Sequence, residues 1–383
     1  MQRPPLARIF LSFLALGSYA FGGPAMVVYI RELVVRRRRW LDEDTFADGV
    51  ALCQSIPGAI AMQVAAFVGL TVRGTPGALV AFIGFGLPAF VFMTVLSGLY
   101  VRFHAIPEVA ALFSGLKVII VAIIVNAASA FAKGAVKDYR DLLMALCSAI
   151  LFWQGASPFV VIAAAACAGC LLFRAIRPSG SAGVRNGSPD IRAIALIGTL
   201  VLLLMVLLYY TDYGLLRLAA VMLKIDLFAF GGGFASLPLM LHQVVEAGGL
   251  IDGKTFMDGV ALGQVTPGPI IITATFVGYV LHGSLGALVS AIAIFTPSFL
   301  MVLLTAPFFQ RLKASRFFLR AVRGILATFV GLLLYVAVKF ALSVPLTALS
   351  GLLFCASYLA LIKKIDILYV VLGGAFLSVL FFR

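Results

Sequence analysis

The residues DGVALCQSIPG at 48–58 decide how this chain folds, because the chain carries them again as DGVALGQVTPG at 258–268. Eight of the eleven positions are identical in the two copies. Each copy is an apolar, helix-like run that breaks at Pro-Gly, since proline has no N–H to donate and disrupts a helix interior. We predict that the function lies at these breaks.

The repetition extends well beyond the motif. FGG at 21–23 returns at 230–232, FVG at 67–69 at 276–278, and GALV at 77–80 at 286–289. The spacing between partners stays at 209 or 210 residues, and the similarity fades beyond about residue 130. We therefore predict two homologous transport repeats, residues 1–173 and 216–383, separated by a polar cytoplasmic loop and a connector helix within 174–215.

The composition indicates a membrane protein. Hydrophobic residues make up 63% of the chain, charged residues 11%, and the mean hydropathy is +1.12. Many apolar runs exceed eighteen residues, the length at which a helix crosses a hydrocarbon core of about 30 Å. We predict an all-α polytopic protein in the lipid bilayer with about 13 membrane segments, six in each half and one connector at 193–210.

An odd number of segments between equivalent points makes the second half enter the membrane from the opposite side. The sequence thus predicts inverted-topology repeats, a common design of secondary transporters, with a substrate site near the midplane. The net charge of +14 fits basic cytoplasmic loops rather than nucleic-acid binding.

One basic cluster conflicts with full crossing. With the N-terminus in the cytoplasm and every segment crossing, Arg36–Arg39 would lie outside, against the positive-inside rule. The conflict disappears if the segments 9–30, 48–72, 216–240 and 256–282 are re-entrant hairpins that break at their glycines or prolines. Broken helices that cross fully remain the alternative.

Four breaks at matching positions of the two halves predict an anion site. A half-helix that starts at a break has free amides and the positive end of its dipole, which together bind anions. The alternative is that Gly and Pro only kink the helices and let them pack. The candidate substrate-binding residues are Gly22, Gly23, Pro24, Gln54, Ser55, Pro57, Gly58, Gly231, Gly232, Gln264, Thr266, Pro267 and Gly268.

Ionisable residues within apolar runs are the next candidates, since they are expensive in a membrane. Asp48 and Asp258 are either N-terminal caps of their segments or carboxylates that couple transport to a proton or cation. Lys117 either meets an oxyanion or extends to the membrane surface. Lys224 and Asp226 are close enough in sequence to compensate one another.

The sequence argues against an enzyme. Its three histidines, His104, His242 and His282, do not form a metal-ligand motif, so we expect neither a metal nor a cofactor. An anion channel is harder to separate from a carrier, because a pore can use the same half-helix ends.

The paired motifs resemble the chromate ion transporter family in its long form with two homologous halves. The resemblance rests on FGGPA at 21–25 and DGVALCQSIPG at 48–58, and on FGGGFASLPLM at 230–240 and DGVALGQVTPGP at 258–269. It implies export of chromate, with sulfate as a similar anion, across a bacterial inner membrane, which confers chromate resistance. Proton coupling and a homodimer are further possibilities that the sequence leaves open.

Overall fold

The computed structural model describes residues 4–174, 190–345 and 347–381. Throughout these ranges the regular structure is helical, which confirms the all-α prediction. Most of the predicted polar loop, residues 175–189, lies outside the described residues.

The first half has its two longest helices, α4 and α5, between shorter ones. The helices are α1 (Leu6–Tyr19), α2 (Gly23–Arg31), a π-helical turn (Glu32–Arg37), α3 (Glu43–Ser55), α4 (Ile60–Phe103), α5 (Pro107–Ala135), α6 (Tyr139–Trp153) and α7 (Pro158–Leu172). The connector α8 (Ile191–Thr211) follows, close to the predicted 193–210.

The second half repeats this order. Its helices are α9 (Tyr213–Phe228), α10 (Gly233–Met240), a π-helical turn (Leu241–Glu246), α11 (Gly253–Val265), a 3₁₀ turn (Ile270–Ile272), α12 (Thr273–Thr305), a 3₁₀ turn (Ala306–Phe308), α13 (Phe309–Ala314), α14 (Arg316–Leu342), α15 (Ala348–Ile362) and α16 (Ile367–Phe381). Even the π-helical turn recurs at the equivalent place. The pairs α6–α7 and α15–α16 follow α5 and α14 in the same order, so the repetition of helices continues past residue 130, where the sequence similarity fades.

The long helices α4 and α12 each contain a sharp turn. Arg73 and Gly74 leave the helical conformation inside α4, and Gly74 has a φ of +68°. Beyond the turn the chain returns so closely that a Cβ on Gly69 would lie 2.1 Å from the carbonyl oxygen of Gly77. The chain makes the matching turn at His282 and Gly283 of α12. Each long helix is therefore a short arm folded onto a long one.

The short helices before these turns also pack against neighbouring helices across the Gly and Pro breaks. The ring of Phe67 in α4 lies against Gly49 of α3, on the other side of the break. Arg8 of α1 lines one cavity together with Arg37 and Arg38, which follow α2. In the first half, the two arms around each break thus lie close to one another.

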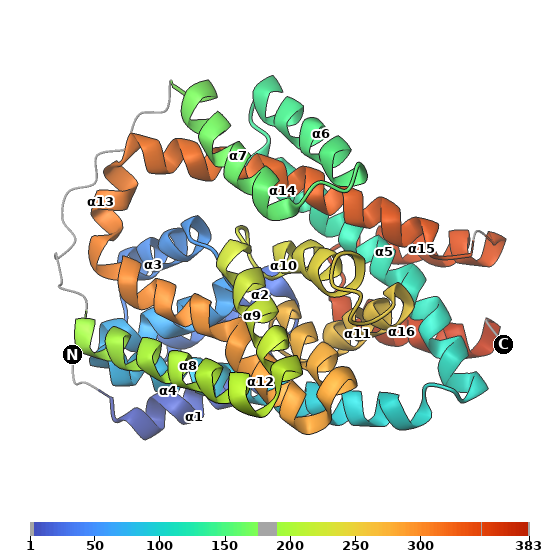
Figure 1. The fold of residues 1–383 in the computed structure, drawn as a ribbon, viewed down its shortest axis with the longest axis horizontal. Helices are drawn as coiled ribbons and strands as arrows, with labels where there is room; N and C mark the ends of the chain where they lie inside the picture. The colour runs from blue at the N-terminus through green and yellow to red at the C-terminus, as the bar shows by residue number, and fades with distance from the viewer. Residues whose placement is uncertain (1–3, 175–189, 346, 382–383) are drawn as a thin grey trace.

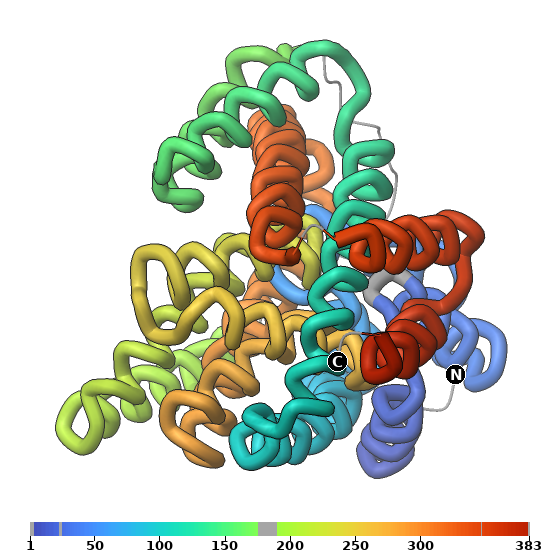
Figure 2. The backbone as a smooth tube through the Cα atoms, turned by 90° about the vertical axis from the view of Figure 1, so that its right-hand side faces the viewer, coloured from blue at the N-terminus to red at the C-terminus, as the bar shows by residue number. Residues whose placement is uncertain are grey.

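The two halves interlock. The pair α6–α7 packs along α14 of the second half, and the pair α15–α16 packs along α5 of the first half (Figures 1 and 2). The helices α4 and α12 pack against each other between the halves. Each half thus packs its last two helices along a long helix of the other half.

Within the described ranges, five helical stretches are long and apolar enough to cross a membrane. They are Ile60–Phe103, Pro107–Ala135, Ile191–Thr211, Ile270–Ala314 and Arg316–Leu342, and several shorter apolar helices accompany them. Because α8 is scarcely covered by protein, its apolar side chains are free to meet lipid. This supports a multi-pass membrane protein, while the count of about 13 segments stays a prediction.

Candidate functional site

The four breaks meet in pairs at the interface between the halves. The N–H of Gly58, in the break before α4, donates to the carbonyl oxygen of Ala229, in the break after α9, at 2.9 Å. The N–H of Gly268, before α12, donates to the carbonyl oxygen of Ala20, after α1, also at 2.9 Å. The Pro-Gly break of each motif is thus hydrogen-bonded to the glycine-rich break of the other half.

A cavity of about 280 Å³ lies where these breaks converge. Three predicted residues, Gln54, Gly231 and Gly232, belong to its wall. Among the described side chains, the lining is Met26, Val27, Val28, Gln54, Ala59, Ile60, Ala61, Gly231, Gly232, Gly233, Phe234, Pro269 and Ile270. Both halves contribute, so the structure brings together segments that are more than two hundred residues apart.

Helix starts give this cavity a positive electrostatic character. The wall contains the first residues of α4 and α10 and the start of the helical segment at Ile270. The first amides of a helix have no acceptor inside it, and they carry the positive end of the helix dipole. The lining residues carry no charged side chain. A small anion can therefore be held by backbone amides and the Gln54 amide group.

The predicted hydroxyls are turned elsewhere. Ser55 Oγ donates to the Ala51 carbonyl oxygen at 2.7 Å, and Thr266 Oγ1 donates to the Gly263 carbonyl oxygen at 3.1 Å. Neither residue is part of the cavity wall. In this conformation both hydroxyls therefore donate to carbonyl groups at the end of the preceding helix instead of to the cavity.

The remaining candidates lie in or beside the breaks. Pro57 accepts a hydrogen bond from Gln63 through its carbonyl oxygen, while Gly58 and Gly268 have positive φ values of 124° and 111°. Gln264 is buried, and its Nε2 has no partner among the described residues. The others sit at helix starts or breaks: Gly22, Gly23, Pro24 and Pro267.

The prediction that Asp48 and Asp258 cap their helices is wrong. The caps are Asp42 and Asp252, six residues earlier, whose side chains accept from the N–H groups of Thr45 and Thr255. The amide and hydroxyl of Thr45 hold the pKa of Asp42 below its usual value. Asp48 and Asp258 consequently lie within α3 and α11, where their charge needs another explanation.

Each motif carboxylate pairs with a lysine of the other half. Lys117 Nζ lies 3.0 Å from Asp258 Oδ1, and the Tyr100 hydroxyl donates to Asp258 Oδ2 at 3.0 Å. Lys313 Nζ lies 3.4 Å from Asp48 Oδ1. Lys117 thus neither lines the cavity nor extends to the surface, contrary to both predictions, because a buried carboxylate supplies its counter-charge.

The expected compensation between Lys224 and Asp226 is also wrong. Lys224 Nζ lies over the ring of Phe159, 4.0 Å from its centre, whereas Asp226 accepts from the N–H of Ser298 at 2.7 Å. Residues two apart on a helix point in different directions, so the spacing itself argued against a pair. Sequence reasoning thus found Asp226 within an apolar run but assigned it the wrong partner, because Ser298 lies 72 residues further along the chain.

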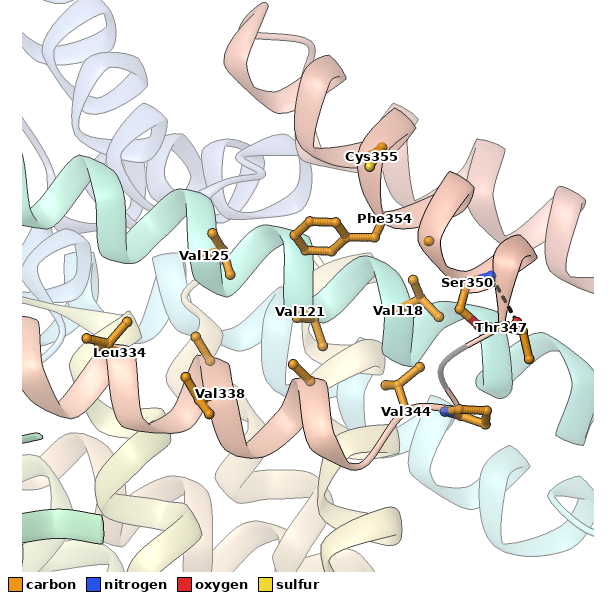
Figure 3. Close-up of a pocket in the computed structure, with 14 residues that line it drawn as sticks. Val118, Val121, Val125, Leu334, Val338, Val344, Thr347, Ser350, Phe354 and Cys355 are labelled. Carbon is orange, nitrogen blue, oxygen red and sulfur yellow. Dashed lines mark hydrogen bonds between the residues drawn. The ribbon is translucent and has the colours of Figure 1, made fainter. Parts of the chain in front are cut away.

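A larger groove, of about 510 Å³, lies between α5, α14 and α15 (Figure 3). Its wall is mostly aliphatic, with Val118, Val121 and Val338 among the lining residues. Its hydroxyl residues, Thr347 and Ser350, bond to one another. A groove of this chemistry suits hydrocarbon and offers little to an oxyanion, so it is not the anion site.

Several known proteins are similar to this chain. A protein of Methanocaldococcus jannaschii, described as an uncharacterized transporter, is 43% identical over 97% of this chain and 93% of its own length. The chromate transport protein of Cupriavidus metallidurans is 28% identical, over 97% of this chain and 92% of its own. That of Pseudomonas aeruginosa is 30% identical, over 81% and 75%. No solved structure matches this chain.

The family comparison reproduces the internal repeat. The chromate transporter model matches twice, over residues 7–170 and 216–379. The two matches end and begin around α8, so each covers one set of repeated helices and leaves the connector between them. The chain belongs to the chromate transporter family.

Proposed function

We propose that this protein is a secondary transporter that exports chromate from the cytoplasm across a bacterial inner membrane and so confers chromate resistance. The cavity at the crossing of the four breaks carries this proposal. Chromate and sulfate are both tetrahedral dianions, and several amides aimed from different helix starts suit such a ligand. We include sulfate as a second substrate because the same donors would accept it.

The proposed binding residues are those of the breaks. Gln54, Gly231 and Gly232 contribute to the cavity wall in this conformation. The other members take part by shaping the breaks or by entering the site when the transporter changes conformation. They are Gly22, Gly23, Pro24, Ser55, Pro57, Gly58, Gln264, Thr266, Pro267 and Gly268.

The proposed division of the chain is an N-terminal transport repeat at 1–173, a loop and connector at 174–215, and a C-terminal repeat at 216–383. We propose that the repeats have inverted topology and that the folded-back segments are re-entrant hairpins. The cavity shared by Arg8, Arg37 and Arg38 supports a common side for both basic stretches. That side would be the cytoplasm.

The topology can be tested in a cysteine-free background. Single cysteines at Arg8 and Arg38 should react with an impermeant thiol reagent from the same side, the cytoplasmic face of inverted vesicles. Labelling of the Arg38 position from the opposite side would contradict the hairpins.

We propose Asp258 and Asp48 as coupling carboxylates that work through their pairs with Lys117 and Lys313. Both pairs join the two halves, so a change in protonation would alter how the halves hold together. Export does not require coupling on energetic grounds, since moving a negative charge outward gains about 2.3 kcal/mol per 100 mV of inside-negative potential.

The transport test uses the purified protein in liposomes loaded with unlabelled chromate. We expect labelled chromate to accumulate transiently by counterflow, to saturate, and to be reduced by sulfate. Counterflow requires a carrier, so flux without saturation or counterflow would indicate a channel instead. A protein that moves neither anion would refute the proposal.

A further inference from the structure

We propose that Asp226 is a proton-binding site linked to the anion cavity, so that the transporter takes up a proton when it binds an oxyanion. The inference rests on the proposed function. It places the proton that accompanies anion binding on a residue outside both repeated motifs, whereas Asp48 and Asp258 are proposed to act on how the two halves hold together.

The first observation is the burial of Asp226. Its side chain is 0% exposed, on α9, three residues before the break at Ala229. Its Oδ2 accepts from the N–H of Ser298 at 2.7 Å, and its Oδ1 has no partner among the described residues. An ionised carboxylate buried without a cation costs several kcal/mol, so a group in this position holds a proton for part of its cycle.

The second observation is a direct connection to the anion cavity. Ser298, which donates its N–H to Asp226, also accepts the N–H of Ala59 on its Oγ at 2.8 Å. Ala59 is the N-cap of α4 and part of the cavity wall. The carboxyl is thus two hydrogen bonds away from a helix start that would hold the anion.

The ionisable groups on and around α9 make no hydrogen bond or ion pair with Asp226 among the described residues. The helix packs against α8, α10, the turn Leu241–Glu246 and α12. Within the described part of the chain, no recorded bond joins the Asp226 carboxyl to any ionisable residue of these elements or of α9 itself: Arg192, Tyr209, Tyr210, Tyr213, Arg217, Lys224, His242, Glu246, Tyr279 and His282. His242 pairs with Glu246, which Lys339 and Tyr335 also contact, and His282 lies 3.9 Å from Asp212.

The first half has nothing equivalent. The positions that correspond to Asp226 and Ser298 at the repeat spacing of 209 are Gly17 and Ala89. Gly17 packs directly against the backbone of Phe85, which leaves no room there for a side chain. The carboxyl and its hydroxyl neighbour therefore occur on one side of the cavity only. A packing role common to both halves would not need them.

The electrostatics give the sign of the coupling. A dianion in the cavity repels an ionised Asp226 through a region of low dielectric constant, and a protonated Asp226 removes that repulsion. Anion and proton therefore strengthen each other's binding, and the effect is reciprocal. The proton travels with the anion rather than against it.

The test measures chromate binding to the purified protein in detergent as a function of pH. The range lies above the second ionisation of chromic acid, so the added anion brings no proton. We expect the affinity of the wild type to fall by up to about tenfold per pH unit where Asp226 loses its proton. A weakly buffered sample with a pH indicator should record uptake of protons on addition of chromate.

Asp226→Asn keeps an acceptor for the Ser298 N–H but cannot titrate. We expect it to bind chromate with an affinity independent of pH and without proton uptake. The matched control is Asp212→Asn, at the N-cap of the same helix, where asparagine caps as well as aspartate. It should keep the pH slope of the wild type, and Asp226→Glu should restore a slope even if the asparagine variant folds poorly.

The result that overturns the inference is an unchanged pH slope and unchanged proton uptake in Asp226→Asn. A slope that follows sodium concentration instead of pH overturns it as well. Absence of chromate binding by the wild type is a different failure, because it removes the proposed function on which the inference rests.

Discussion

The two copies of the motif share their backbone but differ in the surroundings of their aspartates. Asp258 is buried: its side chain is 4% exposed, and that of its partner Lys117 is 10% exposed. Asp48 and its partner Lys313 are each about one-third exposed, at 31% and 29%. Although the two halves repeat the same order of helices, the aspartate of one motif is buried and the aspartate of the other lies near solvent. The difference teaches that equivalent positions in the two halves are not equivalent in energy.

Removing the aspartates should give the largest contrast. Asp258→Ala leaves a buried ammonium unpaired, which we expect to lower the stability by about 3–5 kcal/mol. Asp48→Ala breaks a pair that is about one-third exposed and should cost about 1 kcal/mol or less. Thermal unfolding in detergent measures both.

The control for this contrast is the double variant Lys117→Met with Asp258→Leu. It removes both charges and should recover most of the lost stability. Equal losses in the two single variants would show that the burial difference has no energetic meaning.

The glycines of the breaks should give the next largest effect. Gly58→Ala and Gly268→Ala both place a side chain at positive φ, at a cost of about 1–3 kcal/mol. Gly58 should be the more sensitive, because its Cβ would lie 2.2 Å from the hydroxyl of Ser298, whereas that of Gly268 meets the methyl group of Ala89 at 2.6 Å. Unfolding temperatures of the two variants rank them.

Gly74→Ala separates backbone strain from crowding. Gly74 has a φ of +68° and open space around its Cβ position. Its loss of stability should therefore be the smallest of the three. If it equals that of Gly58→Ala, the contacts at the break contribute nothing.

The motif glutamines should separate binding from stability. Gln54 lines the cavity, so Gln54→Leu should weaken chromate binding about tenfold, the loss of one hydrogen bond to a charged group, with little change in stability. Gln264 has a buried amide nitrogen without a partner, so Gln264→Leu should raise the stability by about 1 kcal/mol. Binding isotherms and unfolding curves for both variants check the two effects. Weaker chromate binding in Gln264→Leu, with unchanged binding in Gln54→Leu, would contradict the assignment of the cavity to the first motif.

The helix caps should show the smallest difference. Asp42→Ala and Asp252→Ala each remove one cap and should each cost about 1 kcal/mol. Because the pKa of Asp42 is lowered in the folded protein, its contribution is present above the ordinary aspartate pKa of about 3.9 and is lost as the pH falls through the lowered value. A difference of more than about 1 kcal/mol between the stability losses of these two variants at neutral pH would show that the two halves also differ in energy at their helix caps.

Several parts of this picture could be predicted from the residues. The composition and the length of the apolar runs predict helices in a bilayer, and the repeated breaks at Pro57 and Pro267 predict where those helices stop. The sequence predicted six segments in each half, but it did not show that α6–α7 pack along α14 and α15–α16 along α5, because such packing requires apolar surfaces rather than particular residues. It also could not find the partners of Asp48 and Asp258, since both lysines come from the other half.

The sequence by itself determined the class of protein, the two halves, the places of the breaks and the family, because hydrophobicity and backbone chemistry are local properties. Only the tertiary structure decided which breaks meet, which residues line the cavity and which carboxylates are buried. Those outcomes depend on contacts between residues about two hundred positions apart, such as Gly58 with Ala229 and Ala59 with Ser298. The DGVAL motif is repeated in the chain, but its electrostatic surroundings are set by the opposite half.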